Sequence, residues 1–514
     1  MYFPVPDKDE DVLGLPLQSI LFGHRLKQDQ TTYEYLLEFL QVMLAKKVIT
    51  TTKESVNTID FFPEVENDSV ITGIKIKPVI NMGLRRFIFF DRSKKDTQSP
   101  CDQDAFEAHK DWLKEEIELD QGSFQRQTSE EDIIEILQGL LYSFSGILNN
   151  RSWCAQSLLP ICTHAILPEA MPKQAKRKKI TFNRDNCPEE IDTGFDFKQY
   201  NFMARGGEVY YLHVLRALTQ HPSYIEPLTN GFKTLLNSFP QLEELSKFIQ
   251  ETWEKNVGTN KNEESNYIDK ELSYIPLGFD ERNIYTLKEL ANFLATDMHP
   301  FEKIEILSQG IVLQIIRMQH LQASYYNEES KPVWLMDVTD NTDKEVKKQA
   351  IANYNANEEN VIKAVNKGFR ELKEIKEMER DKAIKAAEDS TYKLYRRLGK
   401  EIGLIIPLTG TGMRFTLSET LIKFLVTSII EPGKKLTVDT FIERLYEHYG
   451  MIIDSEHYER AVGSHMIEDI SSRTFLYNNK KHFIQKLKEC GFLRDLSDAT
   501  SIIENPYLNS LELD

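Results

Sequence analysis

The stretch TLSETLIKFLVTSIIEPGKKLTVDTFIERLYEHYG, residues 416–450, decides the C-terminal part of the fold. Its first four residues, TLSE, have the form of a capping box, in which a hydroxyl and a carboxylate satisfy free amides at the start of a helix. The box predicts a helix over Leu417–Ile430. A Pro-Gly turn follows, and a second helix is predicted over Val438–Tyr449, ending at Gly450.

Two more helices are expected downstream, over Ser455–Ile470 and Asn478–Glu489, and the short apolar pair Phe492 and Leu493 follows them. Short helices followed by an extended element outline a winged helix-turn-helix. The third helix would enter the DNA major groove, where Arg, Lys, Asn and Gln usually make the contacts. Acidic residues dominate that helix, namely Glu456, Glu459, Glu468 and Asp469. We therefore expect this unit to dock on protein rather than to read bases.

Residues 343–397, upstream of this unit, are rich in Lys, Glu and Ala and contain no proline. Apolar residues recur there every three or four positions, which predicts a long charged helix with one narrow apolar stripe. The stripe includes Val361, Val365, Phe369 and Leu372. Two interpretations stay open. Either the stripe packs on its own chain in a helical hairpin, or these four residues bind a partner or a second copy.

The N-terminal region combines a helical pattern with an alternating one. Thr32–Lys46 has one apolar face at helical spacing. Ser69–Pro78 alternates apolar and polar residues, a turn signal follows at 81–83, and Leu84–Phe90 is rich in aromatic and branched residues. This pattern predicts a β-hairpin formed by the two runs.

Together these patterns predict a mainly α, multidomain protein with a small β-hairpin element near the N-terminus, a long charged helix and a C-terminal winged-helix-like unit. The polar segment Val257–Ser265 is the best linker candidate in the first half. At about 100–200 residues per domain, we expect an N-terminal α+β region (1–125), a helical domain (126–256), a second helical domain with the long charged helix (266–400) and a winged-helix-like domain (401–514).

Composition narrows the class of protein. The chain has 514 residues, 41% of them hydrophobic, which is enough for real cores. Its 63 basic and 80 acidic residues give a net charge of 63 − 80 = −17, so any nucleic-acid contact must come from a local patch. Five scattered cysteines do not form a disulfide framework. No signal peptide or membrane-spanning run is visible, and a cytoplasmic location is expected.

One dense basic run stands out against the acidic chain. It contains Lys173, Lys176, Arg177, Lys178 and Lys179. Such a cluster can neutralise phosphates, which makes these five the candidate nucleic-acid-binding residues. The alternative is a solvated loop that offsets the acidic remainder.

A glycine pair precedes a predicted helix in the motif Arg205, Gly206, Gly207 and Glu208. Paired glycines can turn the backbone sharply and expose amides that hold an anion at a helix N-terminus. The spacing matches neither a Walker A loop nor a dinucleotide fingerprint. The alternative is a structural turn.

No metal site, cofactor or catalytic constellation is predicted. Cys154, Cys162, His164 and Cys187 form the one plausible zinc set, but they lack the short knuckle spacing of zinc sites. Asp91 ends a predicted strand without a nuclease partner motif, and nucleophile triads are absent. The sequence therefore favours a protein without catalytic activity, and a divergent nuclease is kept as an alternative.

Two stretches carry a resemblance to a known group of proteins: NFMARGGEVYYL at 201–212 and GFLRDLSDATSIIENPY at 491–507. The chain resembles subunits of bacterial anti-phage operons, either components of the methylation-associated defence system or the G subunit of phosphorothioation-dependent restriction. The resemblance implies partners in a defence complex, including a HerA/FtsK-like ATPase. It implies no catalytic residue.

The resemblance and the residue patterns lead to one primary hypothesis and, beside the divergent nuclease, one further alternative. The primary hypothesis is a non-catalytic assembly or adaptor subunit of a restriction-like defence complex that docks an ATPase or nuclease. The alternative is a DNA-binding module that uses the basic run at 173–179 and the winged unit.

Overall fold

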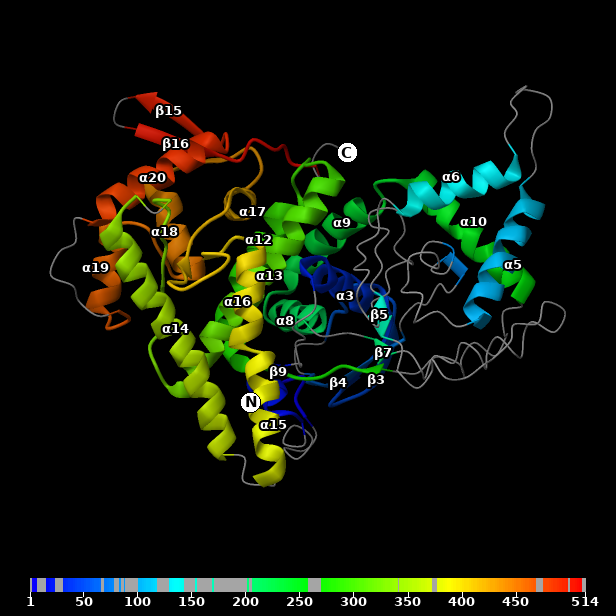
Figure 1. The fold of residues 1–514 in the computed structure, drawn as a ribbon, viewed down its shortest axis with the longest axis horizontal. Helices are drawn as coiled ribbons and strands as arrows, with labels where there is room; N and C mark the ends of the chain where they lie inside the picture. The colour runs from blue at the N-terminus through cyan, green and yellow to red at the C-terminus, as the bar shows by residue number, and fades with distance from the viewer. Residues whose placement is uncertain are drawn as a thin grey trace.

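A computed structural model describes residues 2–6, 15–23, 31–65, 69–77, 83–84, 87, 100–117, 129–142, 153–154, 169–170, 201–202, 206–257, 270–340, 342–371, 377–467, 475–497 and 500–510. Helices dominate this structure, which confirms the predicted mainly α fold (Figure 1). No helix within these ranges combines the length and apolar composition that a bilayer crossing requires.

The central body is a group of packed helices that come from distant parts of the chain. Its main members are α3 (Thr32–Leu44), α8 (Gly206–Gln220), α12 (Asn283–Leu294) and α13 (Pro300–Asn327). Helix α13 is buried over most of its length, so it forms the axis of the main core. A Cβ added at Gly310 would lie 2.2 Å from the Phe424 ring, so glycine permits the close approach of the next layer.

A four-stranded antiparallel sheet covers one side of this body. Its order is β3 (Ser55–Thr58), β2 (Lys46–Thr51), β4 (Ile71–Lys77) and β8 (Lys270–Glu271). The alternating run predicted near residue 70 is therefore a strand, but its partners are β2 and β8.

The predicted pairing of Ser69–Pro78 with Leu84–Phe90 was wrong. Leu84 and Phe87 are helical and fully buried, and they pack with Leu113, Ile134 and Ile249 in a second, smaller core. Their spacing of three residues places both on one helix face, which outweighs the strand propensity of the aromatic residues.

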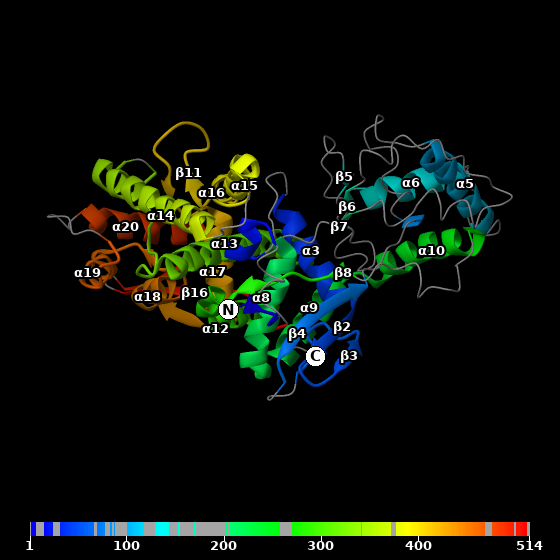
Figure 2. The ribbon, with the colours of Figure 1, turned by 90° about the horizontal axis from the view of Figure 1, so that it is seen from below.

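Three helices build an arm around this second core. They are α5 (Pro100–Glu116), α6 (Glu130–Tyr142) and α10 (Pro240–Val257). Figures 1 and 2 show the arm on one side of the central body, at the opposite end from the C-terminal elements.

The predicted long charged helix is divided into α14 (Lys344–Glu371), α15 (Glu377–Asp389) and α16 (Tyr392–Glu401). Helices α14 and α15 pack together, and both contact the short helix α2 (Leu17–Phe22). The break before α16 falls at Thr391, whose backbone angles (φ −122°, ψ −110°) are not helical.

The remaining elements are short. They are β1 (Tyr2–Phe3) paired with β9 (Ile275–Pro276), β11 (Ile405–Ile406) with β12 (Arg414–Phe415), the trio β5 (Trp153–Cys154), β6 (Glu169–Ala170) and β7 (Asn201–Phe202), the 3₁₀ helices η6 (Pro222–Tyr224) and η7 (Leu277–Arg282), and α9 (Ile225–Leu236).

The C-terminal elements alternate helices with strands. In order they are α17 (Glu419–Ile429), β13 (Lys435–Thr437), α18 (Val438–Tyr449), α19 (Ser455–Gly463), α20 (Phe475–Glu489), β15 (Leu493–Ser497) and β16 (Thr500–Glu504). The strands form a sheet in the order β13-β16-β15.

Local capping explains where these helices start. Ser418, Thr437 and Asp454 each accept a hydrogen bond from an amide in the first turn, and Gly450 ends α18 in the left-handed conformation (φ 66°). The third predicted helix ends at Gly463 rather than Ile470, and the fourth begins at Phe475 rather than Asn478.

A short parallel seam joins the C-terminal elements to the body. Strand β10 (Trp334–Leu335) pairs with β14 (Met451–Ile452), and Met336 forms a bridge to Phe415. The side chain of Asn479 completes the seam: its amide donates to the carbonyls of Met336 and Ile453 at 2.9 Å, and its oxygen accepts from Val338 N at 3.1 Å. The main core consequently includes residues on both sides of residue 401, where the sequence analysis placed the start of the last domain.

We predict that Asn479→Ala lowers the free energy of unfolding by about 1–3 kcal/mol, because it leaves buried backbone groups without partners. Urea denaturation of the full chain measures the loss. The control is Asn478→Ala at the exposed neighbouring position, expected within about 0.5 kcal/mol of the parent. Equal stability of both variants would contradict the role given to Asn479.

Candidate interaction site

Helix α20 is held in one rotational setting by its buried face. Leu476, Phe483 and Leu487 are each at most 1% exposed, and the Phe483 ring stacks on Phe441 with a centroid distance of 6.4 Å. Asn479 lies on the same face and bonds to the seam. Because this face is fixed, the opposite face of α20 is presented to solvent in a defined orientation.

The solvent face of α20 is polar and basic. Tyr477 is 74% exposed, and Asn478, Lys481, Gln485 and Lys488 are exposed along the same helix. The helix has four lysines and one glutamate, in a chain whose net charge is −17. These side chains are hydrogen-bonding groups that commonly contact base edges or phosphates.

The start of α14 lies beside this face (Figure 2). Asn478 Nδ2 is 3.5 Å from Asp343 Oδ2, and the His482 ring is 3.5 Å from the Thr342 hydroxyl. Lys344 and Lys348 are exposed in the first turns of α14. The two helices therefore lie side by side, and the lysines of α14 share this surface with the acids Asp343 and Glu345.

Helix α19 presents a surface of the opposite character. Glu456 has a side-chain exposure of 77%, and Glu459 is also exposed. At its base, Arg460 forms two hydrogen bonds to the carboxylate of Glu443, at 2.6 and 2.9 Å. These bonds fix α19 against α18, so the acidic surface is rigidly placed next to the basic one.

His457 is a structural member of this helix. Its ring nitrogens lie 2.6 Å from Asp454 Oδ1 and 3.1 Å from Glu443 Oε2. Burial alone would lower the pKa of His457, but the two carboxylates outweigh it and raise the pKa. Burial would raise the pKa of Asp454, yet its hydrogen bonds to His457 lower it to about 2.

A buried carboxylate joins the C-terminal elements to the central body. Glu289 of α12 is 0% exposed, and its Oε2 accepts from Arg282 at 2.7 Å, Gln314 at 2.6 Å and Tyr449 at 2.6 Å. Its Oε1 lies 2.7 Å from His448 Nδ1. Four side chains from three elements therefore converge on one charge.

The charge on Glu289 is stabilised by its partners. Burial would raise the pKa of this carboxyl, but the guanidinium of Arg282 and the hydrogen bonds from His448 and Tyr449 outweigh burial and lower the pKa to about 2. Arg282 also lies over the Tyr449 ring at 4.3 Å. No sequence motif marked these residues, because they are separated along the chain.

We predict that Glu289→Gln costs about 3–5 kcal/mol of stability, since it leaves Arg282 buried without a counter-charge. The folded pKa of Glu289 lies below its ordinary value of 4.5, so its contribution is present above about pH 4.5 and is lost as pH falls toward 2. Urea denaturation of parent and variant across this window measures the difference, which should shrink at the acid end.

The control for this prediction is Glu281→Gln. Glu281 is half exposed and pairs only with the exposed Lys331, so a change below about 1 kcal/mol is expected. A stability difference between parent and Glu289→Gln that does not change with pH would contradict the assignment.

The glycine motif at the start of α8 lies where α8 crosses α3. A Cβ built on Gly207 would lie 2.3 Å from Glu38 Cβ and 2.4 Å from Phe39 N, so α8 crosses α3 at backbone distance. Gly207 N donates to Glu38 Oε2 at 3.2 Å, and Glu208 Oε1 accepts from Ser273 N at 2.6 Å. The N-terminus of α8 is thus capped by a carboxylate of this chain, in the position where the predicted anion would sit. Arg205 lies outside the described residues.

We predict that Gly207→Ala destabilises the protein by about 1–3 kcal/mol, because α3 and α8 would have to separate. Thermal or urea unfolding measures it. The matched control is Gly139→Ala in α6, where an added Cβ meets nothing within 4 Å and about 0.5–1 kcal/mol of stabilisation is expected. Destabilisation by both substitutions would argue against a specific crossing.

The apolar stripe of α14 faces the interior. Val361, Val365 and Phe369 are 1%, 2% and 7% exposed and belong to the main core, and Gly368 lies in contact with Leu17 and Leu21 of α2. The stripe therefore packs on its own chain in a helical hairpin, and a partner could reach it only by displacing α2. Leu372 lies outside the described residues.

Several predicted residues are not among the described ones. They are Lys173, Lys176, Arg177, Lys178, Lys179, Asp91, Cys162, His164 and Cys187, together with the side chain of Cys154. Within the described part of the chain, no group of three or more His, Cys, Asp or Glu side chains could hold a metal ion.

An open cleft of about 1010 Å³ lies between the end of α13, α14 and the end of α19. Asn353 and Asn357 line it, but their amides donate to the carbonyl of Val333 at 3.1 and 3.0 Å. These donors hold the segment before β10 in place, so they are not offered to a ligand.

Comparison with known proteins places the chain near one family. Residues 411–507 match the model of the family described as Methylation-associated defense system protein MAD7. The match confirms the resemblance to anti-phage defence components predicted from the sequence, and it covers the elements that carry the α19 and α20 surfaces. Neither the comparison with curated proteins nor the comparison with solved structures gave a match.

Proposed function

Because residues 411–507 match a methylation-associated defence protein, we propose that the chain is a non-catalytic assembly subunit of an anti-phage defence complex. In this proposal the C-terminal elements are a winged-helix docking module, and the helical body is the scaffold that holds it. The partner class is an ATPase or nuclease subunit of the same system.

The topology of the C-terminal elements is the observation that carries the proposal. A strand between the first two helices pairs with a hairpin that follows the last helix, in the order β13-β16-β15. This arrangement supports a winged helix, a fold that is used for docking on both proteins and nucleic acid. In such a fold the recognition helix is the one that precedes the hairpin. That helix is α20, and not the acidic helix expected from the sequence.

The use of charged groups supports a non-catalytic role. Glu289 and Asp337, both 0% exposed, form ion pairs with Arg282 and Arg414 inside the core. Charged groups that serve catalysis usually face a cleft where a substrate can reach them. Here they connect layers of the scaffold.

The acidic surface of α19 is the proposed contact for the protein partner. Its exposed carboxylates, Glu456 and Glu459, complement a basic patch on a partner, and such complementarity steers association and fixes orientation. Because Arg460 and His457 tie α19 to α18, the surface needs little ordering when a partner binds.

We predict that Glu456→Lys combined with Glu459→Lys abolishes co-purification with a co-expressed ATPase or nuclease subunit. The measurement is affinity purification of the tagged full chain at low salt, with the bound subunits quantified. Reversing two rim charges should weaken the complex by roughly tenfold or more and reduce its association rate.

The matched control reverses two exposed acids elsewhere, Glu226→Lys and Glu244→Lys, which changes the net charge equally. Retention of the partner by this control and its loss from the α19 variant is the expected pattern. A parent chain that elutes alone when every subunit of the operon is present would overturn the assembly proposal.

A further inference from the structure

We propose that the exposed face of α20 binds duplex DNA, with the first turns of α14 contacting the adjacent phosphates. This inference rests on the proposed winged-helix module and names the ligand of its reading helix. It departs from the sequence-based expectation that this unit docks on protein rather than reads bases.

The chemistry of the face matches base edges. Asn478 and Gln485 carry amides, the groups that match the donor and acceptor of adenine in the major groove. The Gln485 amide donates to Glu489 Oε1 at 2.9 Å in the free chain, so it would have to exchange that bond for one to a base. Lys481 lies between Asn478 and Gln485 and can donate to guanine or to phosphate. Tyr477, 74% exposed at the start of the helix, adds a hydroxyl and a ring at the groove entrance.

Lys481 is the charge on this face that we assign to DNA. Lys480 and Lys486 are held by acids of the chain, at 2.8 Å from Asp439 and 2.9 Å from Asp340. Lys481 is exposed and has no acidic partner among the described residues. A lysine that is not already neutralised releases counterions when it meets a phosphate, which is the main source of affinity for DNA.

The orientation of α20 is fixed before any ligand binds. The buried face of α20 is fixed by Asn479 and by the stacking of Phe483 on Phe441. Lys344 and Lys348 extend the basic surface along the start of α14, beside α20. Arg494, in the hairpin after α20, pairs with Glu504 at 2.6 Å, so its charge is already neutralised within the chain. The arrangement brings one helix to the groove and the start of α14 to the backbone.

The test is fluorescence anisotropy of the full chain with a labelled duplex of about 25 base pairs, long enough for one docked unit, over a range of salt concentrations. Lys481→Glu is expected to weaken binding by roughly tenfold or more. Lys344→Ala is expected to weaken it less and to reduce the slope of log K against log salt by about one. A single strand of the same sequence should bind more weakly.

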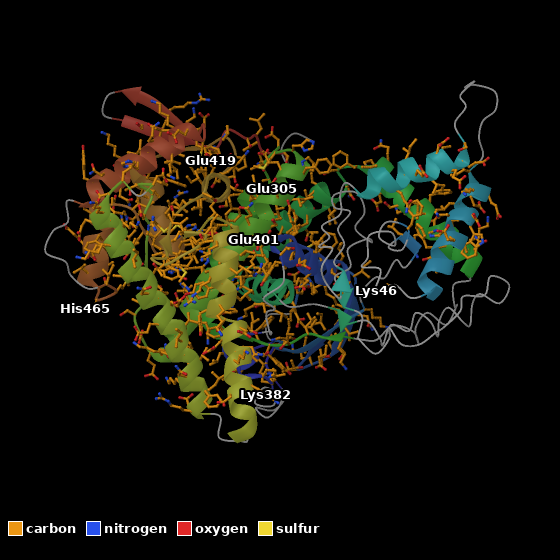
Figure 3. All side chains as sticks on the ribbon, viewed as in Figure 1. Lys46, Glu305, Lys382, Glu401, Glu419 and His465 are labelled. Atoms are coloured by element: carbon orange, nitrogen blue, oxygen red, sulfur yellow. The ribbon has the colours of Figure 1, made fainter. Side chains whose placement is uncertain are left out.

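The control is Lys382→Glu, an equal charge reversal at an exposed lysine of α15, which Figure 3 labels beside the lower part of that helix, away from α20. DNA binding should be kept in this variant. Equal loss in both variants would show a non-specific charge effect and overturn the inference.

Two other outcomes also overturn it. The first is a parent chain that does not bind duplex at low salt. The second is binding that survives Lys481→Glu but is lost when Lys173, Lys176, Arg177, Lys178 and Lys179 are replaced by alanine. If partner subunits still co-purify in either case, the assembly proposal stands while the DNA assignment fails. Loss of the protein partner from Lys481→Glu without any DNA binding would assign α20 to protein docking instead.

Discussion

The buried carboxylate of Glu289 is the interaction on which the arrangement of layers depends. A charge placed in a core is costly unless every lone pair is used, and here a guanidinium, a phenol, an amide and an imidazole surround it. The donors come from the 3₁₀ helix before α12, from α13 and from the end of α18. Small sliding movements between these elements would leave polar groups unpaired, so a single packing is selected over near alternatives.

As a consequence, two surfaces of opposite charge, on α19 and on α20, have a fixed position relative to each other. Helix α19 carries exposed carboxylates and is held to α18 by Arg460 and His457, whereas α20 carries exposed amides and lysines and is held to the seam by Asn479. A subunit with this layout can hold a protein and a duplex at a set angle. The acidic net charge of the chain then limits non-specific contact of the scaffold with nucleic acid.

Much of the local structure was predictable from the sequence. Capping residues such as Ser418 and Thr437 mark helix starts through short-range hydrogen bonds, so α17 and α18 were found within a few residues. Long-range relations were not predictable. The partner of β4 is β2, which precedes it along the chain, and Glu289 meets Tyr449 across 160 residues. The position that we propose for α20 as the recognition helix was not predicted, because it depends on the pairing of β16 with β13, which lies more than 60 residues earlier in the chain.

The parallel pairing of β10 with β14 has a consequence for how the chain is made. Asn479 closes the seam onto Met336, 143 residues earlier in the chain. At about 5–20 residues per second, the ribosome needs roughly 7–30 s to bridge that interval. The β10 edge gains its partner β14 only late in that interval, and α20 is added at its end. The nascent chain is therefore exposed to mispairing late in translation, and chaperone binding at β10 would be most useful at that stage.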